Sequence, residues 1–241
     1  MTKIFILAAA MAAAAFPVHA QTTLTFQDGL GGYAGTQDTM VRSADAGGAY
    51  GSEDYVSVDG DDGSPGLQPN HGLLRFDDLF GTAAWQIQPG ATIVSATLTL
   101  QVFNPGSGLS VYDMLSAWSE DSTWNSLGGG VQANGIEAAA APLWTVGAND
   151  GVANVDVGAL AIDVTGSLQA AQGGATWTGW AMLPFTNGTN GIDFSTSEYV
   201  LAADRPLLTV QVSAVPEPTS VALMLAGLGL VGASLRRRMH A

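Results

Sequence analysis

The sequence predicts an all-β protein, an antiparallel β-sandwich or jelly roll flanked by an N-terminal signal helix and a C-terminal transmembrane helix. Apolar and polar residues alternate from Ala96 to Val102 and again from Leu208 to Val212, as expected of strands with one buried and one exposed face. Breaks rich in glycine, asparagine and proline, such as residues 104–106 and 187–191, separate short apolar runs. Uncharged apolar stretches lie near both ends of the chain. The alternation and the breaks indicate the sandwich, and the end stretches indicate the two flanking helices.

The first 20 residues have the layout of a secretory signal peptide. Lys3 supplies one positive charge, residues 4–15 are an unbroken apolar run, and Val18-His19-Ala20 is a small-residue cleavage site. The run is rich in alanine and has no polar face, so the sequence favours a signal peptide over a core helix. Signal peptidase is therefore expected to cut between Ala20 and Gln21 and to leave an exported chain.

The body of the chain, residues 21–214, is predicted to be a single domain, because its length fits one all-β domain better than two ordinary domains. One short helix is expected over Val164–Ala171, with Thr165 as its N-cap and Gly173 as its end. Further strands are predicted at Thr22–Phe26, Thr39–Ser43, Tyr55–Val58, Leu73–Phe76, Ser110–Leu115, Val152–Val155 and Gly179–Leu183.

The last segment, residues 215–241, combines three signals in a fixed order. Pro216-Glu217-Pro218 comes first, an apolar run over residues 219–235 follows, and three arginines at 236–238 end it. The run is near the short limit for a transmembrane helix, and the arginines place its end on the cytoplasmic side. This layout resembles the PEP-CTERM sorting signal of Gram-negative, exopolysaccharide-producing bacteria.

The resemblance implies processing by an exosortase near residues 216–218. The chain would then pass through an inner-membrane-anchored intermediate and reach the cell surface or extracellular matrix. The alternative is an ordinary C-terminal anchor that stays on the protein.

The body is strongly acidic and has no cysteine. It carries 20 acidic residues against three arginines and no lysine, a net charge of −17. Such a surface repels nucleic acid, anionic lipid and anionic polysaccharide at long range, so nucleic-acid binding is excluded. Without cysteine there is neither a disulfide framework nor a thiolate metal site. Stability must therefore come from packing, with or without help from bound cations.

Several segments of the body, taken in order, resemble a DNRLRE-type domain, a secreted β-sandwich module related to some carbohydrate-binding modules. The likeness implies a polysaccharide partner. The chain departs from the pattern in its Gly/Ala-rich segment, residues 127–142, and in its shortage of basic residues. The matching segments are Asp38-Thr39-Met40-Val41-Arg42-Ser43, Tyr50-Gly51-Ser52, Val56-Ser57-Val58-Asp59, Leu73-Leu74-Arg75-Phe76-Asp77, residues 89–100, Trp118-Ser119-Glu120, Thr123-Trp124-Asn125, Ile162-Asp163-Val164-Thr165 and Arg205-Pro206-Leu207-Leu208-Thr209-Val210.

The three arginines of the body, Arg42, Arg75 and Arg205, are candidate ligand-binding residues. A cluster of planar guanidinium groups suits a carboxylate or sugar hydroxyls. The alternative is that each arginine pairs with nearby aspartates at the sheet surface. Among the aromatic residues, Trp124 and Tyr50 are expected to be exposed and to stack on sugar rings, and most of the six tryptophans are expected in the core.

An acidic, glycine-rich turn is the candidate metal site. Asp59, Asp61 and Asp62, with Asp54 close in sequence, offer the hard oxygen ligands that calcium prefers. The turn is not an EF-hand, because the twelfth position counted from Asp59 is Asn70. Calcium as a structural cofactor and a plain solvated turn are the two interpretations.

The sequence does not indicate an enzyme. His71 is the one histidine of the body, and no Gly-x-Ser-x-Gly elbow presents a nucleophile to it. The expected function is a non-catalytic cell-surface or matrix protein that binds polysaccharide. The alternatives are a structural envelope protein without a specific ligand and a hydrolase acting on extracellular polymer.

Overall fold

A computed structural model describes residues 21–63, 67–148, 154–186, 190–213, 224–232 and 236. Its contacts divide the chain into two units, Gln21–Ser213 and the pair of end segments Met1–Ala20 and Ala214–Ala241. The first unit contains eleven described strands, one α-helix and one 3-10 helix. The elements are β1 (Gln21–Phe26), β2 (Thr36–Arg42), β3 (Tyr55–Val58), β4 (Asn70–Phe76), β5 (Thr92–Asn104), β6 (Gly108–Asp113), β7 (Trp144–Gly147), β8 (Gly158–Asp163), α1 (Thr165–Gln172), β9 (Trp180–Pro184), β10 (Ile192–Ser195), η1 (Ala202–Asp204) and β11 (Leu207–Ser213).

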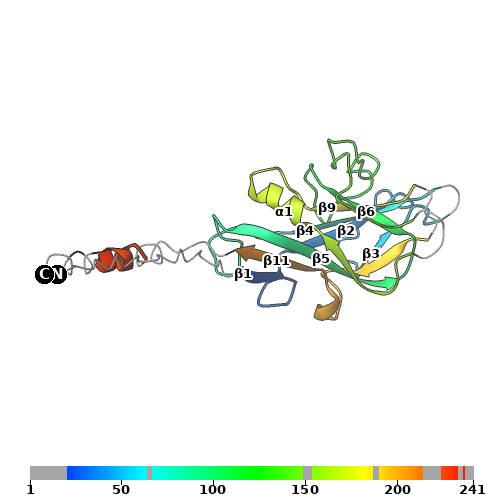
Figure 1. Cartoon of the computed structure of the whole chain (residues 1–241). Coiled ribbons are helices and arrows are strands. Elements are labelled where there is room, and N and C mark those ends of the chain that lie inside the picture. The colour runs from blue at the N-terminus through cyan, green and yellow to red at the C-terminus, as the bar shows by residue number, and fades with distance from the viewer. Residues whose placement is uncertain are drawn as a thin grey trace, which may run out of the picture. The chain divides into compact units, whose positions relative to one another are not determined.

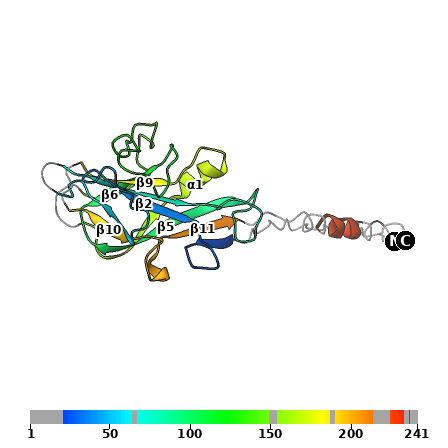
Figure 2. The same cartoon turned by 180° about the vertical axis from the view of Figure 1, so that it is seen from behind.

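The strands form two antiparallel sheets, as predicted for a β-sandwich (Figures 1 and 2). The six-stranded sheet has the order β1-β11-β5-β10-β3, and β8 pairs with the opposite edge of β5. The five-stranded sheet has the order β2-β4-β9-β6-β7. The main core cluster joins buried side chains of both sheets, among them Leu98 and Val210 from the first and Leu74 and Met182 from the second. The two sheets therefore enclose one core, and residues 21–213 hold what they need to fold as a unit.

The long central strand β5 shows why the alternation in the sequence is informative. Ala96, Leu98, Leu100 and Val102 are buried, as the period of two predicts. Nearer the start of β5 the burial pattern slips by one residue, because the register against β11 shifts at a β-bulge between Gln211 and Val212. The bulge leaves Val94 exposed while both Ile93 and Ala96 face the core.

The outer face of the five-stranded sheet is also covered. A second cluster of buried side chains joins Val41, Leu73 and Ala181 of this sheet to Met114, Trp118, Val131 and Ala138 of the segment that follows β6. The Gly/Ala-rich residues 127–142 belong to this cover. Small residues let the irregular segment lie close to the sheet, and the second face of the sheet is thereby removed from water.

The strand predictions at β1 to β6, β9 and β11 are confirmed, with ends that move by up to four residues. The prediction at Val152–Val155 is not confirmed as a strand. Residues 152 and 153 lie outside the described residues, and Val155 forms an isolated bridge to Gly106. Strands β7, β8 and β10 were not predicted.

The helix prediction is right in position but wrong about its N-cap. Val164 stands at the N-cap without a side-chain hydrogen bond, and Thr165 is already the first residue of α1. The Thr165 hydroxyl instead accepts the Ala96 N–H at 2.9 Å, so it ties the helix to β5. The helix ends at Gly173, as predicted.

Two of the predicted features at the chain ends lie outside the described residues: the signal segment up to Ala20 and the Pro216-Glu217-Pro218 motif. Gln21 opens β1, where it pairs with Ser213 of β11. Residues 224–232 are helical. Among the residues that the structure describes, no helix is long and apolar enough to cross a membrane. The predicted transmembrane helix over residues 219–235 stays a prediction.

Candidate ligand-binding groove

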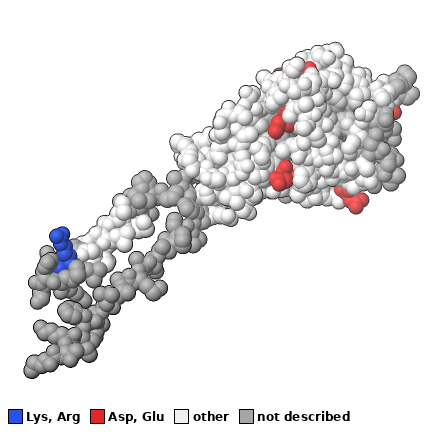
Figure 3. All heavy atoms as spheres, turned by 45° about the horizontal axis from the view of Figure 1, so that its top comes forward, with Lys and Arg blue, Asp and Glu red and all other residues white. Residues whose placement is uncertain are grey.

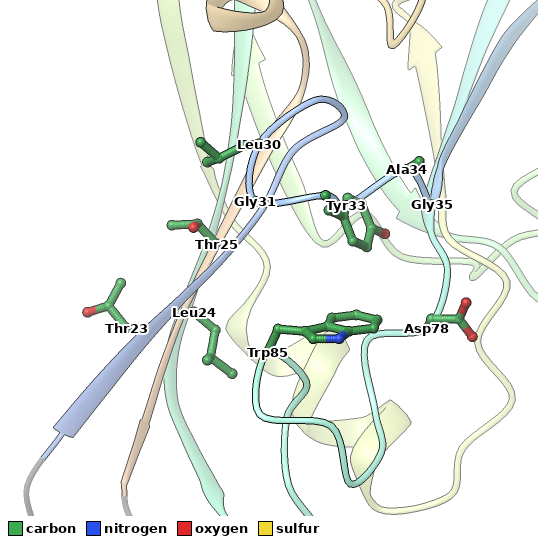
Figure 4. Close-up of a pocket in the computed structure, with 11 residues that line it drawn as sticks. Thr23, Leu24, Thr25, Leu30, Gly31, Tyr33, Ala34, Gly35, Asp78 and Trp85 are labelled. Atoms are coloured by element: carbon green, nitrogen blue, oxygen red, sulfur yellow. The ribbon is translucent and has the colours of Figure 1, made fainter.

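A groove lies beside the free edge of β1 (Figure 4). It has a volume of about 550 Å³ and is lined by residues 23–25 of β1, residues 30–35 of the next loop, Asp78 and Trp85. In the described sheet β1 pairs with β11 alone, so its other edge is open to the groove. In Figure 4 the side chains of Leu24 and Trp85 lie on one side of β1, and those of Thr23 and Thr25 lie on the other.

Trp85 forms the exposed aromatic wall of the groove, with half of its surface open to solvent. It sits in the loop between β4 and β5, which is fixed at both ends by the buried side chains of Leu79 and Ile87. The Ile87 N–H donates to the Leu79 carbonyl at 2.8 Å, and the Gln86 side-chain amide donates to the Asp78 carbonyl at 2.8 Å. The loop is therefore held by its own hydrogen bonds, which fix the position of the Trp85 backbone.

Tyr33 forms the inner wall and orients Trp85. Its ring contacts Trp85 edge-on, with centroids 6.2 Å apart, and packs against Phe26 and Phe76 of the core. Its hydroxyl donates to the Asp77 carbonyl at 2.8 Å. A methyl group at Gly35 would lie 2.8 Å from that hydroxyl, so only glycine fits at this position. The edge-on contact leaves a face of the indole ring available to a ligand.

The groove is electrostatically negative. Burial raises the pKa of Tyr33 above its ordinary value, and Asp28, Asp77 and Asp78 raise it further by disfavouring the phenolate. No lysine or arginine lines the groove. An anionic ligand would therefore meet repulsion from Asp78, and no guanidinium or ammonium group among the lining residues offsets it.

Arg205 supports the groove from behind. Its Nε donates to the Tyr199 carbonyl at 2.8 Å and its Nη1 to the Asp28 carbonyl at 3.2 Å, while its own carbonyl accepts the Gln27 side-chain amide at 2.8 Å. The arginine thus links the loop that lines the groove to the segment before β11. Of the three predicted ligand-binding arginines, it is the one connected to the groove, and it acts there through backbone groups.

Arg42 and Arg75 are not among the residues that line the groove. Each is paired with an aspartate, which is the alternative to ligand binding given by the sequence analysis. Arg42 Nη2 lies 2.6 Å from Asp62 Oδ2. Arg75 Nε lies 2.7 Å from Asp77 Oδ1, and Arg75 Nη1 donates to the Trp118 carbonyl at 3.1 Å. These contacts hold both guanidinium groups in place, although Arg42 Nε is buried without a hydrogen-bond partner. The three arginines are held by separate sets of partners, and none of the contacts joins them into one cluster.

The predicted stacking residues, Trp124 and Tyr50, are also engaged in the fold. Trp124 is partly buried on the second cluster, and its ring lies 4.9 Å from that of His71. Tyr50 packs against the core, donates to Asp45 Oδ2 at 2.7 Å and lies beneath the Arg42 guanidinium. The tryptophans with much exposed surface are Trp85 and, at 37 %, Trp144 on β7.

The predicted calcium ligands are only partly brought together. Asp54 precedes β3 and Asp59 follows it, so the whole strand separates them. Asp62 Oδ2 accepts from Arg42 and, at 2.8 Å, from the Asn70 side-chain amide. Across the described parts of the chain, no three acidic or histidine side chains converge as a metal-binding group. Calcium binding by the turn stays a prediction.

His71 has a structural position in β4. It is buried on the outer face of the five-stranded sheet, and its Nδ1 accepts the Val131 N–H at 3.1 Å. Burial lowers the pKa of His71 to about 4, so the imidazole is neutral at physiological pH. The residue therefore fastens the covering segment to the sheet.

One acidic residue is buried without a charge partner. Asp38 in β2 is 1 % exposed; its Oδ2 accepts the Ser197 N–H at 2.9 Å, and its Oδ1 has no hydrogen-bond partner. Burial raises the pKa of Asp38 well above its ordinary value, and repulsion from Glu198 raises it further. No local pattern in the sequence indicates this burial, because Ser197, which bonds Asp38, follows β10 and is far along the chain.

Comparison with known families supports the interpretation of the C-terminal segment. The family described as the PEP-CTERM protein-sorting motif matches residues 214–238. No curated protein matches the chain significantly. Together with the two-sheet body, the motif defines an exported all-β protein. Exosortase sorts it to the cell envelope or surface.

Proposed function

We propose that the sorted domain is a non-catalytic polysaccharide-binding protein of the cell surface or extracellular matrix, and that the Trp85 groove holds the glycan. The main support for this proposal is the half-exposed indole ring of Trp85. It lies in a hydrogen-bonded loop and forms one wall of the groove of about 550 Å³. An aromatic face in such a position stacks on the apolar face of a pyranose ring, and adjacent polar groups bond its hydroxyls.

Two similarities to known proteins also support this proposal. The body resembles a DNRLRE-type, carbohydrate-binding-module-like domain in the order of its motifs. The sorting motif directs the protein to the compartment where exopolysaccharide accumulates. Both are arguments from similarity, and the groove supplies the site at which the proposal is tested.

The test is glycan binding by purified residues 21–213, measured on an array of neutral and acidic polysaccharides and then by titration with the best ligand. Trp85→Ala should weaken binding about tenfold or more, since about 1.4 kcal/mol of lost stacking is tenfold in affinity. Trp144→Ala is the matched control, because Trp144 is an exposed tryptophan on a different strand. Equal affinity of the two variants would show that the glycan is not held by the Trp85 groove. If the folded wild type bound no glycan, the structural envelope protein would be favoured.

A further inference from the structure

The outer face of the six-stranded sheet begins where the groove ends. Thr23 and Thr25 line the groove along the edge of β1, yet their side chains point to the far side of the strand (Figure 4). The register continues these positions across the sheet. Thr25 pairs with Thr209 of β11, and Thr209 pairs with Thr97 of β5. A ligand in the groove therefore has a row of hydroxyl groups just beyond the edge.

The rows on either side of this one are uncharged, and their side chains are polar or small with the exception of Leu207. Thr23 continues to Gln211 and Ser95 on one side, and Leu207 continues to Thr99 and Ala161 on the other. The threonine row itself continues from Thr97 to the acidic Asp163 of β8. Three strand spacings separate β1 from β8, roughly 14 Å at 4.7–4.9 Å each. This distance exceeds the width of one pyranose ring.

Charge is scarce on this face although the body as a whole is highly acidic. Among its outward positions the acidic ones are Asp163, at the end of β8, and Asp193, whose Oδ2 accepts the Asn104 side-chain amide at 2.9 Å. Elsewhere, on the face shown in Figure 3, acidic side chains are scattered singly. The threonine row itself carries no charge over three adjacent strands.

We propose that the groove and this hydroxyl-rich face form one continuous surface for an extended, uncharged polysaccharide chain. The inference rests on the proposed function and adds the ligand class. The chain is neutral, because Asp78 is the one charged side chain among the residues that line the groove, and Asp28 and Asp77 act on Tyr33 in its inner wall. It is bound along its length, because the hydroxyl groups continue from the groove across β11 to β5.

The experiment titrates residues 21–213 with size-graded neutral glucans, mannans and galactans, and with polyuronates of matched length. The affinity for a neutral chain that binds should rise at least tenfold from the disaccharide to chains long enough to cross the edge. The double variant Thr97→Val/Thr209→Val should lose this gain and keep the affinity for the disaccharide. Valine preserves the β-branched shape, so the sheet is expected to fold.

Thr176→Val is the matched control, because Thr176 is exposed in the loop that leads from α1 to β9 of the other sheet. A flat dependence on chain length, or unchanged affinity of the double variant for long chains, would overturn the extended surface and leave the groove intact. Trp85-dependent binding of polyuronates would overturn the neutral ligand class. If no glycan binds at all, the proposed function itself fails.

Discussion

Acidification should release the segment that covers the five-stranded sheet, because His71 must stay neutral to hold it. The imidazole accepts the Val131 N–H, and a protonated ring could not accept it. In the fold the pKa of His71 is about 4, whereas the ordinary value is 6.5. The unfolded chain therefore binds the proton first as the pH falls.

The magnitude follows from these two values. The gap between 6.5 and about 4 corresponds to about 3 kcal/mol of unfolding free energy. Since the folded pKa is lowered, this contribution is complete above pH 6.5 and is lost as the pH falls toward 4. A domain with 5–15 kcal/mol of total stability would show such a loss clearly.

The assay is urea unfolding at pH steps from 7.5 to 4, followed by far-UV circular dichroism and by tryptophan fluorescence, to which Trp124 beside His71 contributes. His71→Asn is the informative variant, because its side-chain oxygen occupies the place of Nδ1 and does not titrate. Its stability should be lower at pH 7 but should fall less steeply with acid.

Asp38 complicates the measurement with an effect of opposite sign. Its pKa is raised in the fold, so its protonation on acidification stabilises the folded state. Repeating the series in an Asp38→Asn background removes this contribution. If the wild type and His71→Asn lose stability in parallel between pH 6.5 and 4 in that background, the reasoning about His71 is refuted.

Three further outcomes are expected. Asp38→Asn should raise the melting temperature at pH 7, because it removes a buried charge and keeps an oxygen for the same N–H; a lower melting temperature would contradict this. Arg205→Gln should cost roughly 1–3 kcal/mol and weaken glycan binding with little change at other sites, as seen by hydrogen exchange of the groove loop. Gly130→Ala should destabilise by more than 1 kcal/mol or so, because the added methyl group meets the Trp124 ring at 2.5 Å and φ is +80°; denaturant unfolding would reveal it.

The sequence predicts those strands in which apolar and polar residues alternate along the strand itself. In β5 and β11, leucine and valine alternate with threonine and glutamine, and the alternation is visible without a structure. In β8 the outward residues before the terminal Asp163 are Ala159 and Ala161, so the strand is apolar up to its last residue and its period is hidden. In β7 little is buried, and there is no pattern to detect.

The site depends on contacts that no local pattern reports. Trp85 and Trp124 are both tryptophans in loops, and only the neighbours decide which one faces solvent. Trp124 is covered because His71, more than fifty residues earlier, lies beneath it. The Trp85 ring remains half exposed because its contact with the Tyr33 ring is edge-on and leaves a face uncovered. The signal that sequence reasoning could have used is the pair of glutamines after Trp85, whose side chains bond the loop backbone.

The pairing of Gln21 with Ser213 brings the two ends of the domain to one corner. The predicted signal cleavage falls directly before Gln21, and the first residue of the groove, Thr23, follows two positions later. The strand that borders the groove is thus held at its first residue by the last strand of the domain. Fraying of β11 from that corner would therefore loosen the wall of the groove before it reached the core.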